Sequence, residues 1–583
     1  MKKTCSEYGN MSERILNHLN HIYPDVDNNP LAANIIELMK FDDSAEPAEC
    51  HRNIWNQNDI VLITYGDSVV SENEAPLHTL HKFINESLPD TVSIVHILPF
   101  YPYSSDDGFA VINYVEVNQS LGDWKDIQEL SKSYAVMADL VINHCSSRSL
   151  WFDNFKQGKE PGADYFIEVD PDEDLSMVVR PRTSPLLRET ETIDGKKHVW
   201  CTFSHDQVDL DFSNPQVLLE FIKIIRFYLD QGISLFRLDA VAFLWKTIGT
   251  PSINLPQTHD IIRLLRLLIE NVNPNAVIIT ETNIPNRENL SYFGNANEAH
   301  WIYNFSLPPL ILYTMLSGNS HLLKMWMMTM PPAQAGTAYF NFIASHDGIG
   351  MRPVEGIMDD SEVDKIVDTV RRFGGEVSYR TLPDGSHRPY ELNIALIDAM
   401  KGTFDGEDQH HLERFVCAHA IMLALEGVPA FYIHSLLGTR NDNEKRKHTG
   451  QNRAINRHNW QLDRLESELN NQMSLHSRVL EKLSKLMAIR KKQPAFHPNA
   501  TQFTMHFSDS LFGFWRQNRD RSQSIFCIYN ISKEYQELPL RDINLFVIDE
   551  WYDLISLHRY VDPGEVLQIK PYEFVWITNF TPT

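Results

Sequence analysis

The chain contains several apolar segments that end in charged or polar residues, and this repeated pattern constrains the fold more than any other feature. The clearest segment is residues 232–241, which read GISLFRLDAV. Its apolar first half is typical of a strand that is buried on both faces. Side chains two positions apart on a strand point to the same side, so we expect Arg237 and Asp239 to project together. The spacing predicts either a carboxylate nucleophile beside a guanidinium, which favours the ionised form, or a structural ion pair.

Three other segments share this pattern. They are residues 136–144, 277–283 and 339–347, which end in Asn143-His144, Glu281-Thr282-Asn283 and His346-Asp347, respectively. Polar residues at the C-terminal ends of parallel strands mark the active-site face of a (β/α)8 barrel. Since helical stretches separate the strands, the sequence predicts an α/β fold of the TIM-barrel type.

Segments that do not fit the strand and helix alternation predict additions to the barrel. Residues 146–207 show no clear helical period and are too long for an ordinary loop, which indicates an inserted domain. A turn is expected at residues 383–385, and short alternating runs near the C-terminus predict an antiparallel sheet. The predicted units are an N-terminal helical extension (1–57), the first part of the barrel (58–145), the inserted domain B (146–207), the middle of the barrel (208–356), a second inserted segment (357–402), the end of the barrel (403–495) and the C-terminal β domain (496–583).

The composition excludes several classes of function. A net charge of −25 argues against nucleic acid and anionic membranes as partners. No run of about 18 apolar residues occurs, so no membrane span is expected. The 6 cysteines show no C-x-x-C pairing and are expected to be reduced or buried thiols. We expect a cytoplasmic protein that is a monomer or homodimer.

Four motifs in order resemble glycoside hydrolase family 13, the α-amylase superfamily. They are Asn143-His144, Arg237-Leu238-Asp239-Ala240, Thr280-Glu281 and His346-Asp347, and the resemblance covers about residues 58–460. Further motifs are similar to the sucrose-phosphorylase subfamily: SHDGIG at 345–350, RPR at 180–182, and the block from Asn441 to Arg457. Within it, the chain most resembles the phosphorylases of 2-O-α-glucosylglycerol and of glucosylglycerate.

The resemblance implies a role for each site residue. Asp239 would be the nucleophile, Glu281 the general acid/base, and Asp347 would stabilise the transition state. Residues implied to bind the glucosyl unit are Asp106, His144, Phe203, Gln207, Arg237, His346 and Arg453, and those implied to meet phosphate or the acceptor are Arg182, Tyr390, Glu391 and Asn283. Retaining glycoside transfer independently needs one nucleophilic and one protonated carboxyl, about 5–5.5 Å apart. No metal and no cofactor are expected; an α-glucoside and inorganic phosphate would be the substrates.

Three positions depart from the sucrose phosphorylases, which carry Tyr, His and Gln where this chain has Phe243, Asn283 and Glu391. These departures argue against sucrose as the substrate. A glycerate carboxylate would need a cation, for which Arg352 or Arg388 could serve. Glycerol needs none, and we expect Glu391 to bind its hydroxyls and to repel a carboxylate.

The predicted reaction is therefore phosphorolysis of 2-O-α-D-glucosylglycerol, which gives α-D-glucose 1-phosphate and glycerol with net retention. Phosphorolysis of glucosylglycerate, or of sucrose or its 6-phosphate, is the first alternative. A hydrolase or transglucosidase on the same barrel is the second. An inactive sugar-binding subunit is the third, and the presence of all three carboxylates argues against it.

Overall fold

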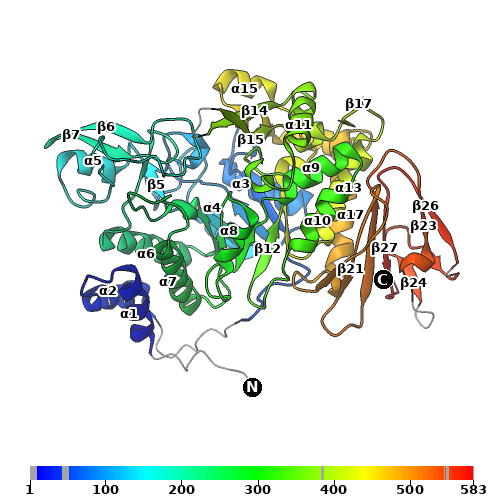
Figure 1. The fold of residues 1–583 in the computed structure, drawn as a ribbon, viewed down its shortest axis with the longest axis horizontal. Helices are drawn as coiled ribbons and strands as arrows, with labels where there is room; N and C mark the ends of the chain where they lie inside the picture. The colour runs from blue at the N-terminus through cyan, green and yellow to red at the C-terminus, as the bar shows by residue number, and fades with distance from the viewer. Residues whose placement is uncertain are drawn as a thin grey trace.

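The computed structural model describes residues 10–41, 51–382, 386–543, 545, 550–562 and 564–581 (Figure 1). Its centre is a closed barrel of parallel strands in the order β1-β18-β12-β11-β10-β9-β4-β3. The strands are β1 (Val61–Thr64), β3 (Ile94–Ile97), β4 (Ala135–Val141), β9 (Ile233–Asp239), β10 (Val277–Thr280), β11 (Trp301–Tyr303), β12 (Ala338–Asn341) and β18 (Val428–Tyr432). The predicted TIM barrel is confirmed.

Apolar runs at residues 59–65, 93–100 and 428–434 predict three strands beside the four that end in polar residues, so the sequence indicated seven of these strands and missed β11. This strand has only 3 residues, too few for an apolar run to stand out. The register of the barrel then fixes the neighbours of the nucleophile candidate. Thr280 pairs with Leu238, so the residues that follow them, Glu281 and Asp239, come to lie beside each other at the barrel's C-terminal end.

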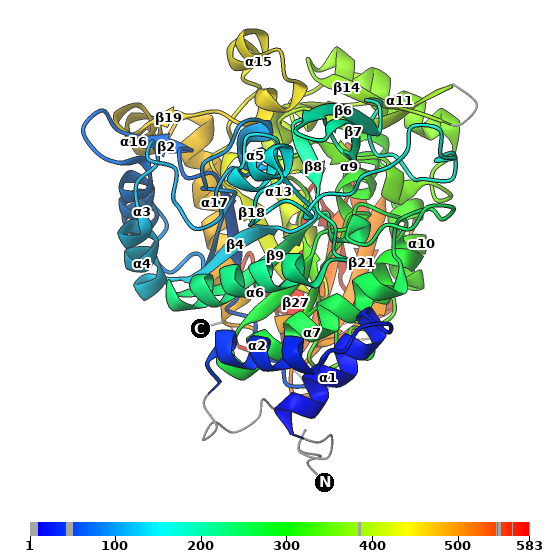
Figure 2. The same cartoon turned by 90° about the vertical axis from the view of Figure 1, so that its left-hand side faces the viewer.

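Helices surround the barrel, as the two perpendicular views show (Figures 1 and 2). They are α3 (Pro76–Ser87), α4 (Trp124–Ser133), α6 (Pro215–Asp230), α7 (Pro256–Val272), α9 (Leu307–Ser317), α13 (His411–Ala424) and α17 (Leu475–Lys491). The start of α6 shows why they form where they do. The Asn214 side chain accepts a hydrogen bond from the Gln216 amide, and Pro215 occupies the first turn, where its missing N–H costs nothing.

Two helices, α1 (Met11–Ile22) and α2 (Asn29–Met39), precede the barrel. They pack on α7 and α6, respectively, below the barrel in the view of Figure 2. The Tyr23 hydroxyl donates to the Phe212 carbonyl at 2.9 Å and fastens the pair to the body. Two helices therefore form within residues 10–41, as predicted, whereas residues 51–57 are irregular.

Two additions stand over the C-terminal end of the barrel, at the upper left and the top of Figure 1. The first contains α5 (Leu150–Gln157), the hairpin of β6 (Leu187–Thr192) and β7 (Gly195–Trp200), and the pair β5 (His144–Ser146) and β8 (Gln207–Asp209). The helix α5 was not predicted, because a span of 8 residues gives too little periodicity. The second is a sheet of β13 (Ile349–Gly350), β14 (Glu376–Thr381) and β15 (His387–Asn393) with helix α11 (Asp360–Arg372). The turn predicted at 383–385 lies outside the described residues.

The C-terminal part forms an antiparallel six-stranded sheet, as predicted, on the right of Figure 1. Its order is β20 (Thr501–Thr504), β21 (Leu511–Gln517), β22 (Ser524–Asn530), β27 (Phe574–Thr578), β24 (Trp551–Asp553) and β25 (Arg559–Tyr560). A pair of strands, β23 (Gln536–Pro539) and β26 (Val566–Ile569), lies beside it. The buried Arg516 joins sheet and barrel, since it donates to the carbonyls of Ala424 at the end of α13 and of His497.

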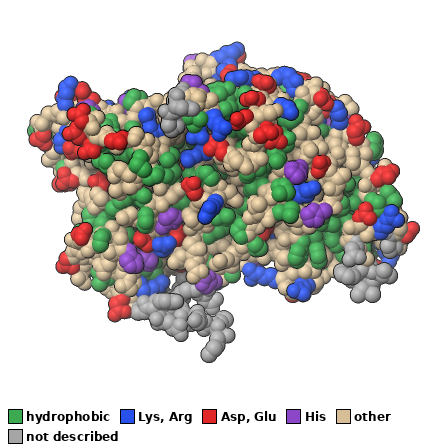
Figure 3. All heavy atoms as spheres, viewed as in Figure 1, with side chains coloured by type: hydrophobic (Ala, Val, Ile, Leu, Met, Phe, Trp, Pro, Cys, Tyr) green, Lys and Arg blue, Asp and Glu red, His purple; other side chains and the backbone are tan. Residues whose placement is uncertain are grey.

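Two predictions from composition concern the surface and the thiols. Among the described residues no helix is long and apolar enough to span a membrane. The face shown in Figure 3 carries both acidic and basic side chains. Cys145, Cys201, Cys417 and Cys527 are free and buried, as expected; Cys5 and Cys50 lie outside the described residues.

Candidate active site

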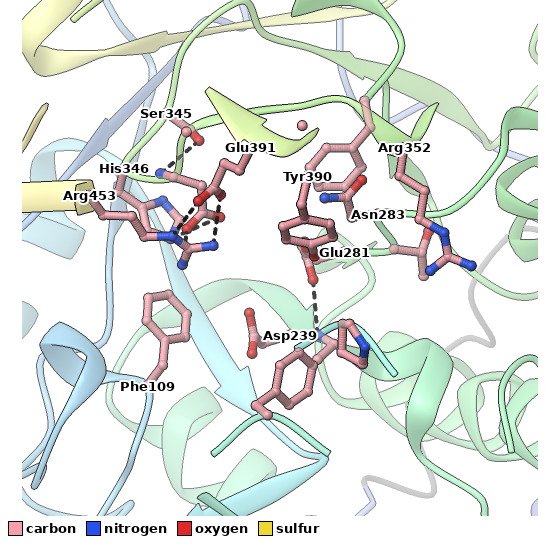
Figure 4. A pocket seen from close by; sticks show the side chains of 18 of the residues that line it. Phe109, Asp239, Glu281, Asn283, Ser345, His346, Arg352, Tyr390, Glu391 and Arg453 are labelled. Atoms are coloured by element: carbon pink, nitrogen blue, oxygen red, sulfur yellow. Dashed lines mark hydrogen bonds and ion pairs between the residues drawn. The ribbon is translucent and has the colours of Figure 1, made fainter. Parts of the chain in front are cut away.

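A pocket opens at the C-terminal end of the barrel, beneath the two additions. Residues from the barrel strand ends, from the inserted segment and from the β13–β15 sheet line it (Figure 4). All but one of the predicted site residues are in the lining: Asp106, His144, Arg182, Phe203, Gln207, Asp239, Glu281, Asn283, His346, Asp347, Tyr390, Glu391 and Arg453. Residues up to 347 positions apart in the sequence thus meet in one cavity.

Arg237 is the exception: it lies outside the lining, and its contact with the sugar stays a prediction. Its side chain is 1% exposed and lies beneath Asp239, to whose Oδ1 it donates at 2.7 Å. The guanidinium also donates to Asp139, and its Nε donates to the Tyr303 hydroxyl at 3.1 Å. Arg237 therefore lies beneath the nucleophile candidate and pairs with it directly.

Asp139 was missed as a site residue. It is fully buried on β4 and pairs with Arg237 and with His96 Nε2, the latter at 2.7 Å. The available signal was a charged residue inside an otherwise apolar buried run, since such a charge must find a partner. Asp139 completes the fixed orientation of the Arg237 guanidinium below the nucleophile candidate.

The two carboxyl groups at the floor, Asp239 and Glu281, titrate as a pair. Burial raises the pKa of both, and the attraction of Arg237 opposes this rise. Arg237 Nη1 is 2.7 Å from Asp239 Oδ1, whereas Nη2 is 3.9 Å from Glu281 Oε1. We therefore place the charge of the pair on Asp239 and the proton on Glu281. From the sequence, Arg237 alone accounts for the charge on Asp239. In the structure, burial and the neighbouring carboxylates raise the pKa of Asp239 and so oppose the effect of Arg237.

The wall beside the floor carries two neutral histidines. Burial lowers the pKa of both His144 and His346. The His346 ring stacks on Phe109 at 5.1 Å between centroids, and its buried Nδ1 makes no hydrogen bond with the described residues. His144 Nε2 lies 3.2 Å from Gln207 Nε2. A buried, unpartnered ring nitrogen next to a carboxylate cluster suits a sugar hydroxyl.

The loop that carries Asp106 has an unusual backbone. Both Asp106 (φ +55°) and Asp107 (φ +47°) are left-handed. Gly108 follows at φ +114°, where an added Cβ would lie 2.6 Å from the Pro99 carbonyl oxygen. Left-handed non-glycine residues cost free energy and persist where the surroundings hold them, often at functional sites. Gln207 Nε2 donates to Asp106 Oδ2 at 3.2 Å and helps to hold the loop.

Arg453 links two carboxylates beside His346 (Figure 4). Its Nη1 is 2.6 Å from Asp347 Oδ1, and its Nη2 and Nε are 2.8 and 3.1 Å from the two oxygens of Glu391. Although burial acts the other way, Arg453 and Arg457 hold the pKa of Asp347 well below its usual range, so Asp347 is ionised. Glu391 was expected to bind glycerol hydroxyls as a free negative charge; in the structure both its oxygens accept from Arg453, which compensates that charge.

Two arginines line the outer part of the pocket without a carboxylate partner among the described residues. Arg182 lies over the Tyr390 ring at 5.7 Å, and Arg352 reaches the lining from the segment after β13. The Asn283 side chain, whose buried Oδ1 accepts no hydrogen bond from the described residues, lies between Arg352 and Glu281 in Figure 4. Arg388, the alternative named from the sequence, pairs with the exposed Asp360 outside the lining.

A buried lysine ties the loop after the nucleophile candidate to the inserted segment. Lys246 Nζ lies 2.7 Å from Asp209 Oδ2 and donates to Asn143 Oδ1 at 2.7 Å. Asp209 in turn accepts from the Thr202 amide and hydroxyl. Within the described ranges no group of three or more His, Cys, Asp or Glu side chains is placed to hold a metal ion.

Known proteins show the same organisation. The family model of the α-amylase catalytic domain matches residues 91–352. A glucosylglycerate phosphorylase of Spirochaeta thermophila is 42% identical over 90% of both chains, and one of Escherichia coli is 39% identical over 97% of this chain and 100% of its own. A glucosylglycerol phosphorylase of Marinobacter adhaerens is 28% identical over 79% of this chain and 92% of its own.

A solved structure agrees with these relatives. The sucrose 6F-phosphate phosphorylase of Thermoanaerobacter thermosaccharolyticum superposes with a TM-score of 0.70 at 26% identity, over 81% of this chain and 94% of its own. The relatives by sequence and the relative by structure are all glucoside phosphorylases. The chain belongs to the α-amylase family, glycoside hydrolase family 13, and within it to the retaining glucoside phosphorylases.

Proposed function

We propose that the chain catalyses the reversible phosphorolysis of glucosylglycerate, which gives α-D-glucose 1-phosphate and glycerate. The observation that carries this proposal is a pair of pocket cations, Arg182 and Arg352, that have no carboxylate partner in the described part of the chain. A site with two such cations suits two anions, inorganic phosphate and the carboxylate of glycerate. Relatives that are 39–42% identical carry the name glucosylglycerate phosphorylase, which supports the same substrate.

This proposal replaces glucosylglycerol as the preferred substrate. The argument for glycerol rested on a negative Glu391 that would repel a carboxylate. In the structure Glu391 is paired with Arg453, which weakens that repulsion. The glucosylglycerol phosphorylase relative is also more distant, at 28% identity.

The proposed mechanism is a double displacement. In the first step Glu281 protonates the glycosidic oxygen while Asp239 Oδ attacks the anomeric carbon, which releases glycerate and leaves a β-glucosyl ester on Asp239. In the second step Glu281, now ionised, takes the proton of the incoming phosphate, whose oxygen displaces Asp239 and restores the α configuration. Asp347, held ionised by Arg453, is placed to stabilise the positive charge that develops on the sugar ring.

Phosphate must compete with water in the second step. Water is at about 55 M and cellular phosphate at roughly 10 mM, so a phosphorylase needs a preference on the order of 5 kcal/mol. Arg182, stacked on Tyr390 at the pocket wall, offers a positioned charge for phosphate. Arg352, beside Asn283, is then available for the acceptor carboxylate.

The reverse reaction tests the acceptor. With α-D-glucose 1-phosphate as donor, phosphate release is compared for D-glycerate, glycerol, fructose and fructose 6-phosphate at equal concentration. We expect the highest kcat/KM with D-glycerate, and Arg352→Ala should raise the KM for glycerate at least tenfold while changing the KM for glycerol by less than twofold. Faster release with glycerol or a fructose acceptor would overturn the substrate assignment.

A further inference from the structure

Strand β15 brings two neighbouring side chains to opposite walls of the pocket. Successive residues on a strand point to opposite faces, and here Tyr390 meets Arg182 of the inserted segment while Glu391 meets Arg453. Both are at least nine-tenths buried, with exposed fractions of 8% and 4%. The strand therefore joins the wall proposed to bind phosphate to the wall proposed to bind the sugar.

Glu391 and Arg453 form a bidentate ion pair. Both carboxylate oxygens accept from the guanidinium, at 2.8 and 3.1 Å, a two-point geometry that fixes orientation as well as charge. Gly348, next to Asp347, makes room for it: a Cβ there would lie 2.5 Å from Glu391 Cγ. A neutral Gln, as in the resembling sucrose phosphorylases, would offer one acceptor and no charge at this position.

We propose that Glu391 is a positioning residue for glucosyl transfer, which anchors Arg453 against Asp347 and offsets the guanidinium's charge at the acid/base carboxyl Glu281. The proposed role needs no contact with the acceptor, because both carboxylate oxygens accept from Arg453. The inference rests on the roles proposed above for Asp239 and Glu281. In this proposal Glu391 influences glucosyl transfer by holding Arg453, without contact with the substrate.

The charges around Glu281 give the sign of the effect. Arg453 attracts the ionised form of Glu281 and so acts to lower its pKa, against the larger effect of burial. Loss of the Glu391 charge leaves that attraction less compensated, so Glu281 would lose its proton at lower pH. The charged and titratable groups that face Glu281 from the packed elements are Arg237 and Asp239 on β9, Tyr303 on β11, Asp347 after β12, Tyr390 on β15 and Arg453.

The test is the pH profile of Glu391→Gln. We expect the alkaline limb of kcat/KM for the glucosyl donor to move to lower pH by on the order of one unit. On that limb the variant would be about tenfold slower than wild type at the same pH. Glu391→Asp keeps the charge on a shorter side chain, and we expect it to lose rate while its limb stays at the wild-type pH.

A matched control changes an ion pair on the same strand outside the pocket. Asp360→Asn removes the partner of Arg388, which also lies on β15, and should leave the profile unchanged. Melting temperatures show whether each variant folds. If Glu391→Gln does not fold, Glu391→Asp alone tests the proposal. A shifted alkaline limb of the pH profile in Glu391→Asp would overturn it. The proposal would also be overturned if folded Glu391→Gln kept the alkaline limb at the wild-type pH, whether or not its KM for the acceptor rose.

Two further measurements separate this inference from the proposed function. All profiles use the acceptor that wild type converts fastest, so a wrong substrate assignment leaves the comparison intact. Asp239→Asn is assayed in parallel. If that variant kept its activity, the proposed catalytic roles would fail irrespective of what Glu391 does.

Discussion

At the scale of single residues, the chemistry depends on three carboxyl groups held in different states by their neighbours. Arg237 lies closer to Asp239 than to Glu281, which separates a nucleophile from an acid in one buried pair. Arg453 fixes Asp347 in the ionised form. The same residue type thus serves three purposes because each copy meets a different cation at a different distance.

Removal of the nucleophile tests this arrangement directly. Asp239→Asn should lower kcat by about four orders of magnitude or more, equivalent to over 5 kcal/mol of transition-state stabilisation. The measurement is phosphorolysis followed by release of glucose 1-phosphate, with the anomer identified by NMR. A β-configured product from the wild type would contradict the double displacement.

The acid/base carboxyl makes a separate prediction. Glu281→Gln should abolish transfer from donors with poor leaving groups, because these need protonation. α-Glucosyl fluoride has a good leaving group and should still form the glucosyl-enzyme. The two donors are compared by the ratio of their rates in mutant and wild type; equal losses would show that Glu281 is not the acid.

At the scale of elements, loops far apart in the sequence complete the pocket. The inserted segment contributes Arg182 and the β13–β15 sheet contributes Tyr390, and their ring contact is the point where the two additions meet over the barrel. Since loops on a rigid barrel vary without changing the strands, acceptor choice can differ between relatives that share one mechanism.

Arg182→Ala tests the element that is proposed to hold phosphate. Loss of the guanidinium should raise the KM for phosphate at least tenfold and increase the fraction of glucose released by water. Phosphate consumption and free glucose are measured in the same reaction, with Arg188→Ala as an arginine control on β6 outside the lining. Unchanged phosphate kinetics would move the phosphate site away from Arg182.

At the scale of the whole molecule, the barrel and the C-terminal sheet share a buried seam. Glu426 lies in it: its carboxyl accepts from the Ala333 amide at 2.7 Å, and its own amide donates to Gln502 on β20 at 2.8 Å. Burial raises the pKa of Glu426 to about 7, well above the usual range of a glutamate side chain. Folding therefore favours its protonated form, and that contribution to stability is lost as pH rises from about 4.5 through 7.

Glu426→Gln mimics the protonated form and should remove this pH dependence. We expect the variant to be more stable than wild type at pH 8, by on the order of 2 kcal/mol, and nearly equal at pH 5. Melting temperatures of variant and wild type at the two pH values test this prediction. The carboxamide oxygen of Gln can still accept the hydrogen bond from the Ala333 amide, so the substitution keeps that contact. A stability difference that is the same at both pH values would contradict the raised pKa.

The sequence by itself determined the barrel, seven of its strands and the three carboxylates, because each motif closes an apolar run long enough to be recognised. It could not show β11, whose 3 residues leave no pattern, or the role of Asp139, whose partner Arg237 is 98 positions away. Only the tertiary structure decided the state of Glu391: its charge invited one interpretation, and the two hydrogen bonds from Arg453, 62 positions later, require another. Local pattern fixes where a strand ends, but the charge a side chain presents to a ligand depends on partners that only folding brings together.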